Sequence, residues 1–284
     1  MKTTDQLIDD LLTLAFAEDV GDGDATTLST IPADAMGRQH LLVKEEGILA
    51  GVEIARKVFE KFDPTLKMTV YINDGAHVKP GDIAFVVEGK VQSLLQTERT
   101  MLNIMQRMSG IATMTNVYQS KLAGLKAKVL DTRKTTPGMR ILEKMAVKIG
   151  GGANHRIGLF DMILIKDNHV DFAGGITNAV NRAKQWCKDN GKDLKIEVEV
   201  RNTAEIDEAL AVGVDRIMLD NFTPQRTAEA VAHIRKSNEK VEIESSGGIT
   251  LDTLRAYGEA GVDFISVGAL THSVKGLDMS FKAC

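Results

Sequence analysis

The sequence predicts an α/β protein whose second half forms a closed or nearly closed α/β barrel. After Lys126, six short apolar runs alternate with amphipathic segments, which is typical of βαβ units with parallel strands. The runs are almost continuously apolar, as expected for strands that are covered on both faces. Because six strands are fewer than the eight of a standard barrel, a doubly wound sheet is the alternative.

The first half is expected to begin with a helix over residues 5–19, where leucine and isoleucine recur at helical spacing. The polar, glycine-rich segment GDGDATT then ends this helix. Residues 37–91 contain short apolar bursts separated by turn signals such as KPGD, which predicts a small β-rich domain. Residues 93–122 predict a long helix that links two domains, with Gly110 as an interruption.

The predicted strands of the second half end near Thr132, Asp167, Val200, Asn221, Ser246 and Ala269. Helices are expected between them, over residues 140–149, 174–190, 203–212, 224–236 and 251–260. Thr223 and Pro224 supply an N-cap and an N1 proline, and Thr250 is a candidate cap for the last of these helices.

Composition and charge exclude several classes of protein. The 284 residues are 43% hydrophobic, enough for a substantial core, which excludes a disordered or collagen-like chain. Lys and Arg total 35 against 39 Asp and Glu, and no long basic tract predicts a nucleic-acid or anionic-membrane surface. No apolar run approaches the roughly 18 residues of a membrane span, and the acidic start differs from a signal peptide. We therefore expect a cytoplasmic protein, whose two cysteines are too few for a disulfide framework or a thiolate zinc site.

Every predicted strand ends in polar groups, at the position where barrels gather functional residues. From Arg133 to Lys166 the chain has seven Lys or Arg and two acidic residues, a net charge of +5 in a chain whose total is −4. Arg140, Lys144 and Lys148 are spaced by four and are interpreted as a solvated helix face. The other cations are candidate ligands for an anionic substrate because of their positions beside strands: Arg133, Lys134, Arg156 and Lys166.

Two further groups of residues point to a phosphorylated ligand. Glu199 and Asp220 lie near the ends of successive strands, which suits a Mg²⁺–phosphate complex held directly or through water. Alternation in EVEV places Glu197 on the same side as Glu199, and the sequence does not choose between them. The SSGG and SVG segments after the last two strands are small and rich in backbone donors, as in the phosphate loops of barrels.

The three glycines of IGGGANHRIG predict a loop that presents His155 and Arg156 to a ligand.

Six segments together resemble the quinolinate phosphoribosyltransferase family: DTRKTTPG at 131–138, GGGANHRIGLFDMILIKDNH at 150–169, EVEV at 197–200, LDN at 219–221, SSGGI at 245–249 and SVGALTHS at 266–273. The resemblance extends to QTERTMLNIMQRMSGIAT at 96–113 and covers nearly the whole chain, with ESSGG in place of the ASGG that the family leads us to expect. It implies an N-terminal α/β sandwich domain over residues 1–110, joined by the tail 273–284, and an irregular α/β barrel over 111–272. It also implies a homodimer or higher homo-oligomer with shared active sites.

The same resemblance implies the reaction and the residue roles. Quinolinate and 5-phosphoribosyl-1-diphosphate would react with Mg²⁺ as cofactor, giving nicotinate mononucleotide, CO₂ and diphosphate. Quinolinate would be bound by Arg99 from the neighbouring subunit and by Arg133, His155, Arg156 and Lys166. Lys134, Glu199 and Asp220 would serve the diphosphate and Mg²⁺, with catalytic roles for these three and Lys166. The phosphoribosyl group would be held by Ser246, Gly247, Gly248, Val267, Gly268 and Ala269.

Three other interpretations are open at this point. A phosphate-binding barrel isomerase or aldolase would also have phosphate loops after its late strands, with Lys166 as a Schiff-base lysine. Residues 75–90 resemble the hammerhead of biotinyl or lipoyl carriers but lack the modified lysine in its usual turn. A paralogue in molybdate-related transport would keep the fold, although the complete set of motifs argues against it.

Overall fold

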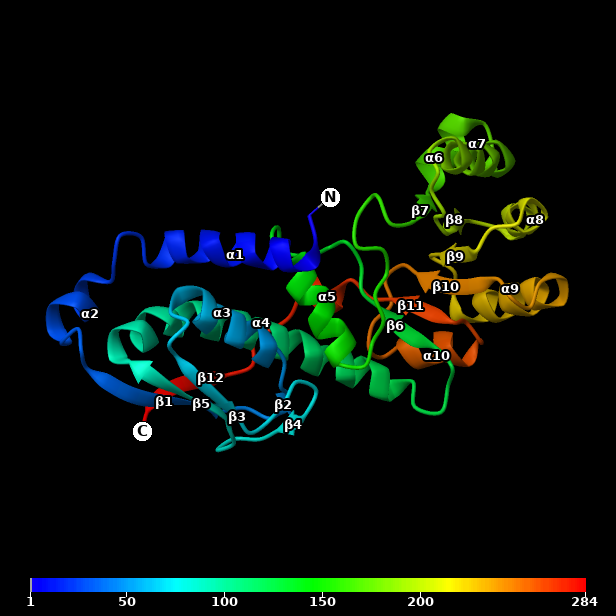
Figure 1. Ribbon diagram of the computed structural model, residues 1–284. Coiled ribbons are helices and arrows are strands. Elements are labelled where there is room, and N and C mark those ends of the chain that lie inside the picture. The colour runs from blue at the N-terminus through cyan, green and yellow to red at the C-terminus, as the bar shows by residue number, and fades with distance from the viewer. Residues whose placement is uncertain (1) are drawn as a thin grey trace. The chain divides into compact units, whose positions relative to one another are not determined.

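The computed structural model describes residues 2–284 and divides the chain into two compact units (Figure 1). The first unit comprises Met1–Asn116, Thr135–Gly151 and Ala269–Cys284. The second comprises Val117–Lys134 and Gly152–Gly268. The division by contacts differs from the predicted domains, which placed residues 111–272 in the barrel: residues 111–116, 135–151 and 269–272 belong by contacts to the first unit.

A four-stranded antiparallel sheet forms the first unit's framework, in the order β12-β1-β5-β3. Its strands are β1 (Met36–Val43), β3 (Lys67–Val70), β5 (Ile83–Lys90) and β12 (Met279–Ala283). The strands β2 (Gly47–Ile48) and β4 (His77–Val78) form a separate pair. The C-terminal strand β12 is thus an edge strand of the first sheet, and Phe281 on it packs against Phe59 and Phe85 in the core.

The helices of the first unit are α1 (Thr4–Asp19), α2 (Ala25–Thr30), α3 (Val52–Phe62), α5 (Arg140–Ile149), α11 (Ala269–His272) and most of α4 (Val91–Lys121). Thr3 begins α1 with a capping box, and Asp24 caps α2 inside the segment that was expected to be a loop. Helix α3 lies within the region that was predicted to be β-rich, and it was not predicted. Its signal was present in the sequence, since the buried residues Val52, Ile54, Val58 and Phe59 form an apolar face at helical spacing.

Helix α4 runs without a break through Gly110, so the predicted interruption is wrong. Gly110 instead allows the C-terminal segment to pack closely against α4. A Cβ atom built at residue 110 would lie 2.2 Å from the backbone oxygen of Lys275. The C-terminal segment can pass this close to α4 only because Gly110 has no side chain.

Helix α5 belongs to the first unit because a buried ion pair joins it to α4. The carboxylate of Glu143 is fully buried and lies 2.8 Å from Nη2 of Arg107, and it also accepts a hydrogen bond from the Thr136 N–H. The solvated face predicted for Arg140, Lys144 and Lys148 is wrong at its centre, since Lys144 is only 2% exposed. Spacing by four shows which residues share a helix face, but not whether that face is covered.

Six parallel strands form the sheet of the second unit, in the order β6-β11-β10-β9-β8-β7. They are β6 (Lys128–Leu130), β7 (Ile163–Ile165), β8 (Ile196–Val200), β9 (Arg216–Asp220), β10 (Glu242–Ser246) and β11 (Phe264–Ser266), which are the six predicted strands. Chain order continues in one direction from β7 to β11, and β11 then pairs with the first strand β6. A doubly wound sheet would reverse at a switch point, so the topology is that of an α/β barrel.

The barrel is open between β6 and β7, which are not paired among the described strands. Ala153 occupies the free edge of β6. Its N–H donates to the oxygen of Val129, and its oxygen accepts from the N–H of Asp131. This pairing brings the loop that carries His155 and Arg156 to the end of β6.

The helices of the second unit are α6 (Asp167–Ala173), α7 (Ile176–Asp189), α8 (Thr203–Val212), α9 (Pro224–Ser237) and α10 (Leu254–Glu259). Figure 1 shows them along the outer side of the curved sheet. Thr223 and Pro224 begin α9 as predicted, but α10 is preceded by Thr253, so the cap expected at Thr250 is wrong. The short helix α6 was not predicted. Across residues 2–284 no helix is long and apolar enough to cross a membrane.

Replacing Gly110 with alanine tests the close contact between α4 and the C-terminal segment. Helix propensity alone would make Gly110→Ala stabilising by about 1 kcal/mol. The clash with the Lys275 oxygen predicts the opposite sign, a loss of about 1–3 kcal/mol in the free energy of unfolding, measured by urea denaturation. Gly276→Ala is a matched control, because its new Cβ would lie 3.4 Å from the Gln106 side chain. Equal stabilities of the Gly110→Ala variant and the wild type would contradict the packing role.

Candidate active site

The carboxyl ends of the parallel strands bring most of the predicted site residues to one edge of the second unit. Residues at this edge come from all six strands or directly follow them: Arg133, Lys134, Lys166, Glu199, Asp220, Ser246, Val267 and Gly268. Pairing in register places Asp220 opposite Ser246, and the Val267 N–H donates to the oxygen of Leu130 across the sheet. The site is therefore a consequence of strand register.

Two guanidinium groups gather on one side of this edge. Arg156 follows the strand-like residue Ala153, and Arg133 follows β6. Burial lowers the pKa of Arg156, and the positive charge of nearby Arg133 lowers it further. A bound carboxylate would relieve the repulsion between these two arginines, so their arrangement suits an anionic ligand.

Two carboxylates and a lysine lie on the other side. Burial raises the pKa of Glu199, the negative charge of Asp220 raises it further, and Lys166 opposes both effects. Lys166 Nζ lies 3.7 Å from Glu199 Oε2. The carboxylates of Glu199 and Asp220 therefore share a site that gains from an additional cation, and oxygen ligands of this kind suit Mg²⁺.

The remaining predicted residues lie near this edge or in the other unit. Lys134 is exposed after β6, and its N–H donates to Oγ1 of Thr132. Ala269 begins α11 and belongs by contacts to the first unit, directly after Gly268. Arg99 lies on α4 in the first unit and is exposed. Its action on a neighbouring subunit stays a prediction.

Comparison with known proteins gives the family. The family model described as "Quinolinate phosphoribosyl transferase, N-terminal domain" matches residues 24–109, and the corresponding C-terminal domain model matches residues 111–282. The chain belongs to the quinolinate phosphoribosyltransferase family. Membership removes the aldolase and biotinyl-carrier alternatives, and 45% identity over 96% of the chain to a protein named quinolinate phosphoribosyltransferase argues against the transport paralogue.

Relatives of this phosphoribosyltransferase come from plants and bacteria. It is 45% identical to quinolinate phosphoribosyltransferase [decarboxylating] 1b of Nicotiana tabacum, over 96% of this chain and 81% of that protein. It is 43% identical to the probable nicotinate-nucleotide pyrophosphorylase [carboxylating] of Bacillus subtilis, over 95% and 91%. The crystal structure of NadC from Streptococcus pyogenes superposes with a TM-score of 0.91 at 39% identity, covering 99% of this chain and 98% of that one.

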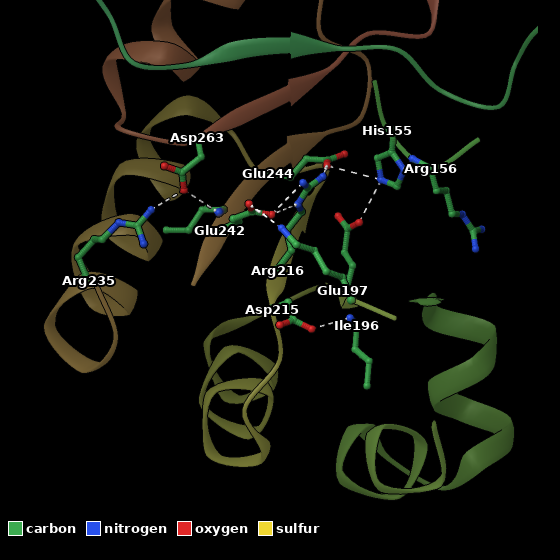
Figure 2. A network of polar contacts seen from close by, with 12 residues as sticks. His155, Arg156, Ile196, Glu197, Asp215, Arg216, Arg235, Glu242, Glu244 and Asp263 are labelled. Carbon is green, nitrogen blue, oxygen red and sulfur yellow. Dashed lines mark hydrogen bonds and ion pairs between the residues drawn. The ribbon is translucent and has the colours of Figure 1, made fainter. Parts of the chain in front are cut away.

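This family member contains a buried polar network that reaches the loop of His155 and Arg156, as Figure 2 shows. His155 is 8% exposed, and its Nε2 lies 3.0 Å from Glu197 Oε2 and 3.6 Å from Glu244 Oε2. Arg216 Nη1 donates to Glu244 at 3.0 Å, and its Nε and Nη2 donate to Glu242. Strands β8, β9 and β10 supply the carboxylates and Arg216, and His155 comes from the loop before β7. The Arg156 side chain extends away from this network in Figure 2.

The hydrogen bonds decide which ring nitrogen of His155 carries the proton. Nδ1 accepts the Arg156 N–H at 2.7 Å, so in the neutral ring the proton lies on Nε2 and faces Glu197. The atoms of His155, Glu197 and Glu244 are close enough to hold a metal ion. However, a protonated Nε2 has no lone pair to offer, and Arg216 already supplies positive charge at Glu244. We therefore interpret the cluster as a support for the loop that carries Arg156.

The two carboxyl groups of this network are difficult to ionise together. Burial raises the pKa of Glu197 to about 7, with Arg216 opposing the shift. Burial raises the pKa of Glu244 to about 8, and the neighbouring charge of Glu197 adds to that shift. The EVEV pattern does not choose between Glu197 and Glu199, but the structure separates them: Glu197 is enclosed in this network, whereas Glu199 lies beside Lys166.

Glu244 and Arg216 were missed as site residues, although a signal was present. Both are charged residues inside apolar strand runs, VEIESS and RIMLDN, where an unpaired charge would be costly. That pattern indicates that each needs a buried partner. It does not reveal which residues pair, because the partners lie on strands that are distant in the sequence.

Glu244→Gln is expected to change how stability depends on pH. The pKa of Glu244 is about 8 in the folded protein and near its ordinary value of 4.5 when unfolded. Between these values the folded state keeps a proton that the unfolded chain has released, so the free energy of unfolding falls as pH rises. In Glu244→Gln this fall from about pH 5 to pH 8 should become smaller, as measured by urea unfolding at several pH values.

Glu242→Gln is the matched control, because Glu242 bonds the same arginine and is shifted in the opposite direction. Burial opposes its ionisation, but hydrogen bonds from Lys195 and Arg216 lower the pKa of Glu242 overall. Its stabilisation is present above its unfolded pKa and is lost as pH falls, so Glu242→Gln should cost most at neutral pH and least in acid. The same pH profile for both variants would contradict the assignment of opposite shifts.

Proposed function

We propose that this chain transfers the phosphoribosyl group of 5-phosphoribosyl-1-diphosphate to quinolinate, with loss of CO₂, and so forms nicotinate mononucleotide and diphosphate for NAD biosynthesis. The observation that carries the proposal is that the carboxyl ends of one parallel sheet carry both a pair of neighbouring guanidinium groups, Arg133 and Arg156, and a pair of neighbouring carboxylates, Glu199 and Asp220. The cations suit a dicarboxylate, whereas the carboxylates suit the Mg²⁺ complex of a diphosphate.

Arg133 and Arg156 would clamp the quinolinate carboxylates, with Lys166 at the mouth and Arg99 from a partner subunit. His155 would contribute at the base of this site. Because its Nδ1 bonds the Arg156 backbone, its orientation and that of Arg156 are linked. The clamps act by orientation, since the pyridine nitrogen must face C1 of the ribose.

Glu199 and Asp220 would hold Mg²⁺, directly or through water, because a bound cation would reduce the repulsion between their carboxylates. The metal, when bound, neutralises charge on the leaving diphosphate. Lys134 would bind the diphosphate, and the same two carboxylates would stabilise positive charge on the ribose ring. The 5′-phosphate would be held by Ser246, Gly247, Gly248, Val267, Gly268 and Ala269.

The reaction needs no separate base. The C1–O bond breaks with its electron pair on the diphosphate, and the pyridine nitrogen forms the new bond to C1. The resulting pyridinium stabilises the electron pair left at C2 when the adjacent carboxylate departs as CO₂, and C2 then takes up a proton. The protein contributes positioning and electrostatics rather than a covalent intermediate.

Assembly and location are separate predictions. We propose a homodimer or higher homo-oligomer with shared active sites, on the basis of the family resemblance of Arg99. The cytoplasmic location also stays a prediction, since a relative in Arabidopsis thaliana is named as chloroplastic.

An assay with quinolinate, phosphoribosyl diphosphate and Mg²⁺ tests the proposed function, with CO₂ and nicotinate mononucleotide as products. Nicotinate in place of quinolinate should react about 5- to 150-fold more slowly, because one carboxylate leaves part of the cationic site unpaired at a cost of about 1–3 kcal/mol. Comparable kcat/KM values for the two acids would contradict the dicarboxylate site.

Mixing two inactive variants tests the shared site. Arg99→Ala and Lys134→Ala homodimers should each be nearly inactive, since each lacks one charge contact in both sites. After subunit exchange, a mixed dimer has one site with both wild-type residues. Equal mixing should restore about a quarter of wild-type activity if the sites are independent. No recovery, with exchange confirmed by mass spectrometry, would mean that Arg99 does not complete a partner's site.

A further inference from the structure

Asn221, directly after β9, has an unusual backbone conformation. Its φ is 54°, and it is the only residue other than glycine with a positive φ in the part of the chain that the structure describes. Asparagine tolerates this left-handed region better than most residues, but the conformation still costs free energy. Surrounding contacts must therefore maintain it, and such residues cluster at functional sites.

Three contacts hold Asn221 between the ends of β9 and β10. Its backbone N–H donates to the oxygen of Ser246 at 2.9 Å. Its side-chain Nδ2 donates to Oδ2 of Asp220 at 2.6 Å. Its Oδ1 lies against Gly247, where an added Cβ would be only 2.2 Å away. One residue thus contacts the carboxylate on one side and the glycine loop on the other.

Gly247 is matched to Asn221 in two ways. Its φ of +106° disfavours any other residue, and its missing side chain leaves the space that the Asn221 amide fills. The loop Ser246–Gly248 and the carboxylate of Asp220 therefore cannot move independently without breaking a contact to Asn221.

We propose that Asn221 is a positioning residue for phosphoribosyl diphosphate, one that sets the Asp220 carboxylate relative to the Ser246–Gly248 loop. This inference rests on the proposed function, in which these two elements bind opposite ends of the same substrate. Nδ2 fixes one carboxylate oxygen of Asp220, which leaves the other oxygen for the substrate complex. Residues that orient binding groups in this way commonly change affinity or activity by about 10- to 100-fold when they are replaced.

Asn221→Gly removes the amide and retains the backbone, because glycine adopts a positive φ without strain. Stability to urea should be equal to or above that of the wild type. The kcat/KM for phosphoribosyl diphosphate and its calorimetric affinity should fall about 10- to 100-fold, while the calorimetric affinity for quinolinate should stay unchanged. Asn190→Gly is the matched control: Asn190 also follows an aspartate, is exposed, and lies at the end of α7.

Asn221→Asp keeps the size and replaces the amide donor with a second negative charge beside Asp220. It should weaken phosphoribosyl diphosphate binding at least as much as the glycine variant does. A double-mutant cycle with Gly247→Ala tests the contact with the loop. The strain of the positive φ at 247 is present in both backgrounds, but the clash with Oδ1 is absent once residue 221 is glycine. Gly247→Ala should therefore lower affinity for phosphoribosyl diphosphate less in the Asn221→Gly background.

The outcomes separate this inference from the proposed function. If wild-type protein does not convert quinolinate, the proposed function fails. If wild-type protein is active and folded Asn221→Gly retains full affinity for phosphoribosyl diphosphate, the positioning role is wrong. Equal losses in affinity for both substrates would also overturn it, because they would indicate a general structural defect. Additive effects of the two substitutions in the double-mutant cycle would show that Asn221 and Gly247 are not coupled, which would contradict the proposed contact with the loop.

Discussion

Parallel hydrogen bonding between six neighbouring strands is the constraint on which the site of the second unit depends. Because β6 pairs with β11, the last strand returns beside the first, and all six carboxyl ends meet at one edge. Residues that are far apart in the sequence, such as Arg133 and Asp220, which are separated by 87 positions, thereby reach the same edge. A shift of one residue in the register between β9 and β10 would move Ser246 away from Asp220 and separate the carboxylate from the phosphate loop.

The interior of this barrel is unusual in containing charge as well as apolar side chains. Burying Glu197, Glu244 and Arg216 is costly unless each carboxylate is paired or protonated. The network meets this requirement only in part: Arg216 donates to Glu244, Nε2 of His155 lies 3.0 Å from Glu197, and burial favours the protonated form of both carboxyls. Among the described residues, Oε1 and Oε2 of Glu197 and Oε1 of Glu244 accept no hydrogen bond. Its outer end fixes the backbone of Arg156. In the proposed mechanism Glu244 and Arg216 do not touch the substrate, but their network supports Arg156, which does.

The two halves of the proposed substrate site have opposite electrostatic characters. Around Arg156 like positive charges are held together, and around Glu199 like negative charges are held together, in each case with partial burial increasing the cost. In the proposed reaction, the carboxylates of quinolinate would relieve the repulsion between the arginines, and a metal ion bound with the diphosphate of the second substrate would relieve the repulsion between the carboxylates. The two substrates would then occupy neighbouring parts of one edge of the sheet, which suits a transfer reaction that needs them in contact.

The sequence by itself determined the six barrel strands, the long helix, the family and the residues at the strand ends, because apolar runs and local motifs are encoded over short distances. Tertiary structure decided the rest. Helix α5 follows the barrel's first strand but joins the first unit, since Glu143 finds its buried partner Arg107 on α4. Gly110 permits a close approach rather than breaking a helix, because the segment that it meets lies 165 positions later in the chain, at Lys275. Glu197 and Glu199 look equivalent in EVEV, and only the neighbours supplied by other strands make one a buried support and the other a partner of Lys166.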